Sequence, residues 1–122
     1  MTTETEKAIG FSRVKKIGNF ISVAGTAAIA KNGKTSCPGD VLGQFHRCME
    51  IIQKALSEKG ASLKDVIRTR ILFTDISNWG EIADAHAEYF KDICPASTFM
   101  EVNRFIKPEW LIEVEADCII SD

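Results

Sequence analysis

Two carboxylates near the C-terminal end of the chain are the residues best suited to do chemistry. Glu113 and Glu115 stand in segment 111–116, where apolar and acidic residues alternate. This alternation predicts a strand that carries both glutamates on one face. Such a face is either exposed to water or lines a site, where a glutamate acts as a general base or holds a water molecule. The alternative is a structural role, in which both glutamates pair with arginines across a subunit interface.

The cysteines and histidines do not form a metal-binding pattern. None of the four cysteines belongs to a C-x-x-C pair, and His46 and His86 are distant from all of them except Cys48. No metal site is therefore predicted. Cys48 and Cys118 have apolar neighbours and are expected to be buried, and His86 is expected to pack in the core. This cysteine usage indicates a reduced, cytoplasmic protein.

Strands are predicted around the two glutamates and along most of the chain. Gly18-Asn19 is typical of a two-residue hairpin turn, and Pro95 precedes a strand because proline is excluded from helix interiors. The predicted strands are 11–17, 20–24, 66–74, 94–102 and 111–116, with 27–30 as an optional continuation of the second.

The predicted strand 66–74 carries two arginines that are suited to pairing with acidic groups. Alternation places Arg68 and Arg70 on one face, and Ile67 and Thr69 on the other. The arginines are expected to meet an acidic ligand or to pair across strands with Glu113 or Glu115.

Two amphipathic helices are predicted between the strands. Segment 40–59 has apolar residues at helical spacing, with Gln44 assigned to its polar side and Gly60 as its C-terminal stop. A second helix runs from capping residues near Asp75 to about Lys91.

The order of elements predicts an α+β fold with a mixed β-sheet. Helices between single strands require crossovers, so both helices are expected on one face. The opposite face then needs another cover, and a second copy of the chain is the economical one. The 122 residues suit a single domain, 1–122.

Composition excludes several classes of partner. The 15 basic and 17 acidic residues give a net charge of -2 and a pI of about 5.7, so nucleic acid is not an expected partner. No apolar run approaches the roughly 20 residues that span a membrane. Residues 1–7 are polar and have no signal-peptide core.

Six motifs occur in an order that resembles the RidA/YjgF family, also described as endoribonuclease L-PSP. The match runs from about Gly10 to Ile119. The motifs are Gly10-Phe11-Ser12, Gly18-Asn19 before a strand ending in Gly25, segment 60–66, Thr74-Asp75-Ile76, Pro95-Ala96 and segment 112–116.

The resemblance implies a chorismate-mutase-like subunit, a homotrimer and three small-molecule clefts between subunits. Members of the deaminating branch hydrolyse reactive enamines and imines, such as 2-aminoacrylate, without a metal or organic cofactor. By resemblance, Glu113 matches the glutamate that orients the hydrolytic water. Ser97, followed by Thr98, stands where deaminating members have the arginine of R-P-A-R-[ST], which binds the substrate carboxylate in a bidentate grip.

Three further cleft positions differ from the deaminating pattern. Phe11 replaces a tyrosine, Ala24 replaces a serine and Ala83 replaces an asparagine, while Trp79 lies in the same second-helix region. The resemblance therefore implies an RidA-like scaffold with a changed cleft, for which 2-aminoacrylate is a poor substrate.

Three functions follow from this pattern. The first is hydrolysis of an enamine or imine by Glu113, with a substrate that lacks a carboxylate or binds it through Arg13, Arg68 or Arg70. The second is a non-catalytic trimer that binds a metabolite or a protein. The third is the endoribonuclease activity of the family's older label, against which the acidic pI argues.

Overall fold

The computed structural model describes residues 4–121. The longer elements, in chain order, are α1 (Glu4–Ile9), β1 (Val14–Ile17), β2 (Phe20–Thr26), α2 (Val41–Glu58), β3 (Val66–Phe73), α3 (Trp79–Phe90), β4 (Ala96–Glu101) and β5 (Ile112–Ile119). Short 3-10 turns, η1 (Leu63–Asp65) and η2 (Ile76–Asn78), precede β3 and α3. This order confirms the predicted succession of strands and two main helices. The helix α1 was not predicted, and residues 1–3 of the polar N-terminal segment lie outside the described residues.

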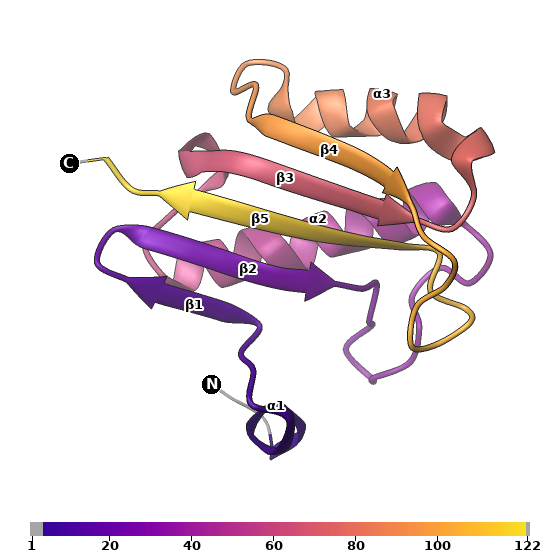
Figure 1. Cartoon of the computed structure of the whole chain (residues 1–122), viewed down its shortest axis with the longest axis horizontal. Coiled ribbons are helices and arrows are strands. Elements are labelled where there is room, and N and C mark those ends of the chain that lie inside the picture. Colours follow the sequence, from indigo (N-terminus) through magenta and orange to yellow (C-terminus); the bar gives the residue numbers. More distant parts are fainter. Residues whose placement is uncertain (1–3, 122) are drawn as a thin grey trace.

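The five strands form one mixed sheet in the order β1-β2-β5-β3-β4 (Figure 1). Strands β3 and β4 are parallel because α3 carries the chain back across the sheet, and every other pair is antiparallel. The β1–β2 hairpin turns at Gly18, whose φ of 58° is the left-handed conformation that such turns need. The predicted mixed sheet is confirmed.

Helices α2 and α3 pack on the same face of the sheet. Figure 1 shows α2 behind the strands, and α2 contacts β2, β5 and α3. Alternate residues of β5 point toward this layer and are buried, whereas Glu113, Glu115 and Asp117 between them are half-buried on the other face. The core also takes in Phe45 and Ile52 of α2, both almost fully buried. Burial of each such side chain stabilises the fold by roughly 1.5–3 kcal/mol.

Helix α2 begins and ends where its capping residues indicate. The Asp40 carboxylate accepts a hydrogen bond from the Gly43 N–H at 3.0 Å, which satisfies one of the unpaired donors of the first turn. At the other end, Gly60 adopts a φ of 82° and terminates the helix. The predicted range of 40–59 is therefore correct to within one residue at each end.

Two strand predictions in the N-terminal third are wrong in extent. The first strand begins at Val14 rather than Phe11, because Glu6 holds the preceding residues: its carbonyl accepts from the Phe11 N–H at 2.9 Å. Segment 27–30 adds only an isolated bridge between Ile29 and Thr35. That segment folds back on itself rather than continuing β2.

Gln44 is fully buried, although helical periodicity assigned it to the polar side of α2. Its side-chain amide donates to the Cys37 and Glu109 carbonyls at 3.3 and 3.1 Å and accepts from the Leu111 N–H at 2.9 Å. Three backbone groups therefore compensate for burial of the amide. Gln44 fixes the start of β5, two residues before Glu113.

The prediction that Ile67 shares the buried face of Thr69 is also wrong. A register shift between Val66 and Arg68 against β5 turns the Ile67 side chain outward, and it is exposed. A β-bulge of this kind resets the alternation for the rest of a strand.

Two of the four cysteines lie in the core. Cys48 and Cys118 are fully buried, as predicted, and none of the four cysteines forms a disulfide. Burial raises the pKa of Cys48 to about 12 and that of Cys118 to about 11, so both remain protonated thiols at neutral pH.

Candidate functional site

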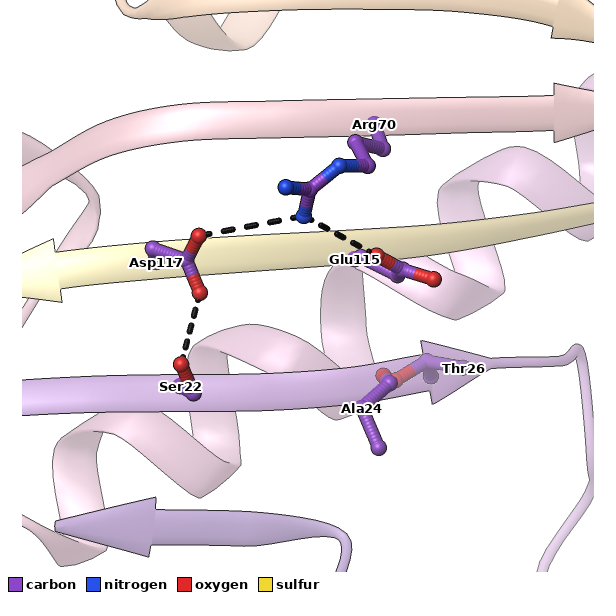
Figure 2. Close-up of polar contacts among 6 residues, drawn as sticks. All are labelled: Ser22, Ala24, Thr26, Arg70, Glu115 and Asp117. Carbon is purple, nitrogen blue, oxygen red and sulfur yellow. Dashed lines mark hydrogen bonds and ion pairs between the residues drawn. The ribbon is translucent and has the colours of Figure 1, made fainter.

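The face of β5 that points away from the helices carries three acidic residues, and two of them have partners. Arg70 of β3 donates to Glu115 at 3.1 Å and lies 3.8 Å from Asp117, which also accepts from the Ser22 hydroxyl at 2.7 Å. Figure 2 shows the Arg70 guanidinium reaching across β5 between the two carboxylates. The predicted cross-strand pairing of Arg70 is confirmed for Glu115.

Glu113, the third acidic residue, differs from its two neighbours. No donor among residues 4–121 forms a hydrogen bond or ion pair with its carboxylate. The carboxylate lies over Gly25 of β2, where an added Cβ would approach Glu113 Oε1 to 2.6 Å. Glycine at position 25 therefore makes the space that Glu113 occupies.

The charge state of Glu113 follows from this setting. Burial raises the pKa of the Glu113 carboxyl, the nearby Glu115 raises it further, and Arg13 offsets part of the effect. The same carboxyl can therefore hold and release a proton closer to neutral pH than an ordinary glutamate. We call Glu113, Gly25 and Arg13 the glutamate half of the site.

A second cluster of polar groups lies at the edge of the sheet. Ser97 of β4 is exposed, and it pairs in register with the fully buried Thr69 of β3. Their hydroxyl oxygens are 2.6 Å apart, and Thr69 Oγ1 lies 3.0 Å from Nε2 of His86 on α3. We call Ser97, Thr69 and His86 the serine half of the site.

His86 is held as a buried, hydrogen-bonded core residue, which confirms the prediction made for it. Its ring centroid lies 4.6 Å from that of Phe90 and 5.1 Å from that of Phe99. Burial lowers the pKa of His86, so the imidazole is neutral at pH 7. Trp79 extends this aromatic row to the surface, with its ring edge-on to Phe99 at 5.0 Å.

The two halves lie on opposite faces of the sheet within one chain. Ser97 shares the helix-covered face with Thr69, whereas Glu113 shares the open face with Glu115 and pairs in register with Leu72. A strand separates β5 from β4. One chain therefore does not bring Ser97 and Glu113 together.

The remaining predicted site residues divide between the two faces. Thr98 pairs in register with Arg70 and so lies on the open face. Ala24, which Figure 2 labels on β2, precedes Gly25 in the chain. Ala83 belongs to α3, the helix that carries His86 and Trp79. Phe11 is partly exposed beside β1.

Phe11 also lines a cavity of about 440 Å³ at the N-terminal end of the sheet. Lys7 of α1 and Lys15 of β1 contribute to its walls. This cavity is separate from the residues that surround Ser97, so Phe11 joins the serine half only if another chain brings them together.

Sequence reasoning missed Thr69 and Gly25 as members of the candidate site. Thr69 was assigned only to a strand face, and its signal is a hydroxyl residue at a position whose neighbours on that face are apolar. Gly25 was taken as the end of a strand, whereas its role depends on a side chain near the opposite end of the sequence. That relation becomes visible only through the β2–β5 register.

Neither a metal site nor a membrane-spanning helix is found in the described part of the chain. Within residues 4–121, no group of three or more His, Cys, Asp or Glu side chains is placed to hold a metal ion. None of the helices in this part of the chain is long and apolar enough to cross a bilayer.

Known proteins resemble this chain over nearly its whole length. A family model described as endoribonuclease L-PSP matches residues 1–120. A RutC family protein from Pyrococcus abyssi is 37% identical over 116 residues, which cover 94% of this chain and 91% of that protein. A protein of Acinetobacter baylyi named 3-aminoacrylate deaminase RutC is 33% identical over 99 residues, covering 81% and 78% of the two chains.

A solved structure agrees with these sequence relatives. A member of the YjgF/YER057c/UK114 family from Mycobacterium tuberculosis superposes with a TM-score of 0.84 at 39% identity, covering 97% of this chain and 93% of that chain. The chain therefore belongs to the RidA/YjgF family, also described as endoribonuclease L-PSP, as its sequence motifs predicted.

Proposed function

We propose that this protein hydrolyses an enamine or imine, with Glu113 as its acid–base residue. The observation that carries the proposal is that Glu113 has no partner within residues 4–121, whereas Glu115 and Asp117 on the same face are paired. An unpaired carboxyl with a raised pKa is suited to proton transfer. The name of the relative from Acinetobacter baylyi, 3-aminoacrylate deaminase, supports the reaction class.

The reaction needs only one residue that both donates and accepts protons. Protonated Glu113 donates its proton to the enamine carbon and gives the iminium ion. The Glu113 carboxylate then takes a proton from water as the water oxygen adds to the iminium carbon, which forms a neutral carbinolamine. Glu113 donates this proton to the nitrogen and takes the hydroxyl proton of the carbinolamine as the C–N bond breaks, so ammonia leaves and the carbonyl product forms. One water molecule is consumed, and Glu113 ends in its starting state.

We further propose that the site is completed between chains of a homotrimer. Its two halves lie on opposite faces of one sheet, so a cleft that contains both requires two copies. The open face also exposes Phe20 and Ile119, which pair in register, together with Ile17. Exposed apolar side chains on a face with no helix favour a cover from another copy.

The proposed cleft sets limits on the substrate. Ser97 offers no positive charge to a carboxylate, and Arg70 is already engaged by Glu115 and Asp117. Arg13 is close enough to influence the pKa of Glu113 and remains a candidate for an anionic group. We therefore expect 2-aminoacrylate to be hydrolysed poorly, and a substrate without a carboxylate to be preferred. A reduced, cytoplasmic location is part of the same proposal.

The test compares Glu113→Gln with Glu115→Gln, which makes the same chemical change on the same strand face. Imines are generated in the assay by amine and amino-acid oxidases, and ammonia release is measured above the spontaneous rate. We expect Glu113→Gln to lose about 10²–10⁴-fold in rate, as for other acid–base residues, and Glu115→Gln to retain most activity. Equal rates in wild type and Glu113→Gln contradict the proposal, and the protein is then a binding trimer at most.

Oligomeric mass tests the second part of the proposal. Light scattering of the wild-type protein at micromolar concentration is expected to give three times the 13.5 kDa chain mass. A stable monomer that still hydrolyses imines contradicts the proposal of an intersubunit cleft, because Ser97 and Glu113 of one chain cannot share a site.

A further inference from the structure

The direction of each hydrogen bond in the serine half can be worked out from its surface end. Ser97 Oγ lies 3.1 Å from the Pro95 carbonyl oxygen, which can only accept. Serine has one hydroxyl proton, so Ser97 donates it to Pro95 and must accept at its other contact. Thr69 Oγ1, at 2.6 Å, is therefore the donor to Ser97.

The chain of hydrogen bonds continues into the core. Thr69 has given its single proton to Ser97, so it accepts in its 3.0 Å contact with His86 Nε2. A neutral imidazole carries one ring proton, and here that proton must sit on Nε2. The chain of donors thus runs from His86 through Thr69 and Ser97 to the Pro95 carbonyl.

This chain of hydrogen bonds leaves one lone pair of the Ser97 hydroxyl oxygen unused. The Ser97 oxygen has donated once and accepted once, so one lone pair remains, and Ser97 is exposed while Thr69 is fully buried. We infer that Ser97 is a specificity residue that accepts an N–H bond from the ligand, and that Thr69 and His86 are positioning residues that hold it as an acceptor.

The ligand class follows from this polarity. An amine, amide or amidine N–H satisfies the lone pair, whereas a carboxylate brings a second acceptor against it. The inference rests on the proposed function, because it orients the substrate there: the nitrogen lies at Ser97 of one chain and the carbon that receives the proton lies at Glu113 of another. Ammonia would then be released beside Ser97.

The binding test uses three isosteric probes that differ in hydrogen-bonding capacity. Acetamidinium offers only donors, acetate offers only acceptors, and acetamide is neutral and offers both. Titrations are followed by the backbone amide resonances of Ser97 and Thr98 in the assembled protein. We expect acetamidinium to bind about 5-fold more tightly than acetate, the value of one net hydrogen bond, with acetamide between them.

Two variants separate hydrogen bonding from net charge. Ser97→Ala keeps the charge of the protein and removes the acceptor, so the preference for acetamidinium should disappear. Thr69→Val removes the donor to Ser97 and should let its hydroxyl turn toward acetate, whereas Thr69→Ser should keep the wild-type preference. A wild-type protein that binds acetate as tightly as acetamidinium, or a preference that survives in Ser97→Ala, overturns the inference.

The tautomer of His86 gives a second readout that does not depend on binding or turnover. Long-range ¹⁵N–¹H spectra of the wild-type protein at pH 7.5 should show a protonated Nε2 and an unprotonated Nδ1. The opposite tautomer overturns the inference because it reverses every donor in the chain. Both readouts stand apart from the Glu113→Gln assay, so loss of the proposed catalysis and loss of the acceptor role are distinguishable.

Discussion

The glutamate half and the serine half of the site prepare their polar groups in opposite ways. Glu113 has a carboxyl that no donor in residues 4–121 engages, in a space that exists because residue 25 has no side chain. In the serine half, His86, Thr69 and Ser97 have every proton of their hydrogen-bonded chain assigned. The proposed function accounts for this difference: a group that exchanges protons is left without partners, and a group that recognises a ligand is held in one state.

The difference also shows in how each half depends on the fold. Glu113 depends on the β2–β5 register, which aligns it with Gly25, and on Gln44, which fixes the start of β5. The serine half depends on the parallel pairing of β3 with β4 and on the packing of α3. Substitutions in one half should therefore leave the other intact.

After Glu113→Gln itself, the largest effect is expected from Gly25→Ala. The added methyl group would lie 2.6 Å from Glu113 Oε1, so the carboxylate must move. A displacement of about 1 Å can reduce a catalysed rate by roughly 10²-fold, and we expect a loss of that size in ammonia release. Gly80→Ala on α3 is the matched control, because nothing lies within 4 Å of its added methyl group.

The effect on the other half should be absent. Gly25→Ala is expected to preserve the acetamidinium preference and the His86 tautomer of the wild type. Full activity in Gly25→Ala would show that the position of Glu113 does not limit the reaction.

The next largest effect is a loss of stability in Thr69→Val. The substitution keeps the shape of the side chain and leaves the buried His86 N–H without its acceptor, which costs about 1–3 kcal/mol. Urea unfolding should show this loss in Thr69→Val, and Thr69→Ser should restore most of it because the hydroxyl returns. Equal stability of wild type and Thr69→Val would mean that the Thr69–His86 contact contributes nothing to folding.

Sequence periodicity was sufficient to predict the sheet, both main helices and the face of β5 that carries the glutamates. Its errors occur where a polar residue is buried or a strand is irregular. Periodicity predicts Gln44 to be a surface residue because it contains no information about the three backbone groups that other loops bring to this side chain. Ile67 reads as buried because a bulge has no fixed sequence signature.

The candidate site was predictable only where chemistry and strand alternation coincide. Glu113 was found because a carboxylate on an alternating strand is conspicuous, and Ser97 because it interrupts a family motif. Placement of the two on opposite faces was not predictable, since it depends on how β4 pairs with β3. A parallel crossover strand carries no sequence mark of its register.

The smallest expected effects are the changes in the free energy of unfolding caused by Glu113→Gln and Glu115→Gln, which should have opposite signs. A raised pKa means that ionised Glu113 is disfavoured in the folded state. The protonated carboxyl of Glu113 therefore makes its full contribution to stability below the ordinary pKa of glutamate. This contribution is lost as the pH rises through the raised pKa of the folded state. A glutamine side chain does not ionise, so Glu113→Gln should match the wild type at low pH and exceed its stability at pH 7–8 by no more than about 1 kcal/mol.

Glu115→Gln should change stability in the opposite direction. It weakens the 3.1 Å contact with Arg70, whose side chain is 40% exposed, so solvent screening limits the loss to about 0.2–1 kcal/mol. This loss should shrink with added salt because the pair is partly exposed. Urea unfolding at pH 7.5 and at low and high salt measures both variants together. Destabilisation of both by the same amount would make Glu113 a second structural ion-pair residue and would remove the distinction between the unpaired and paired glutamates of β5.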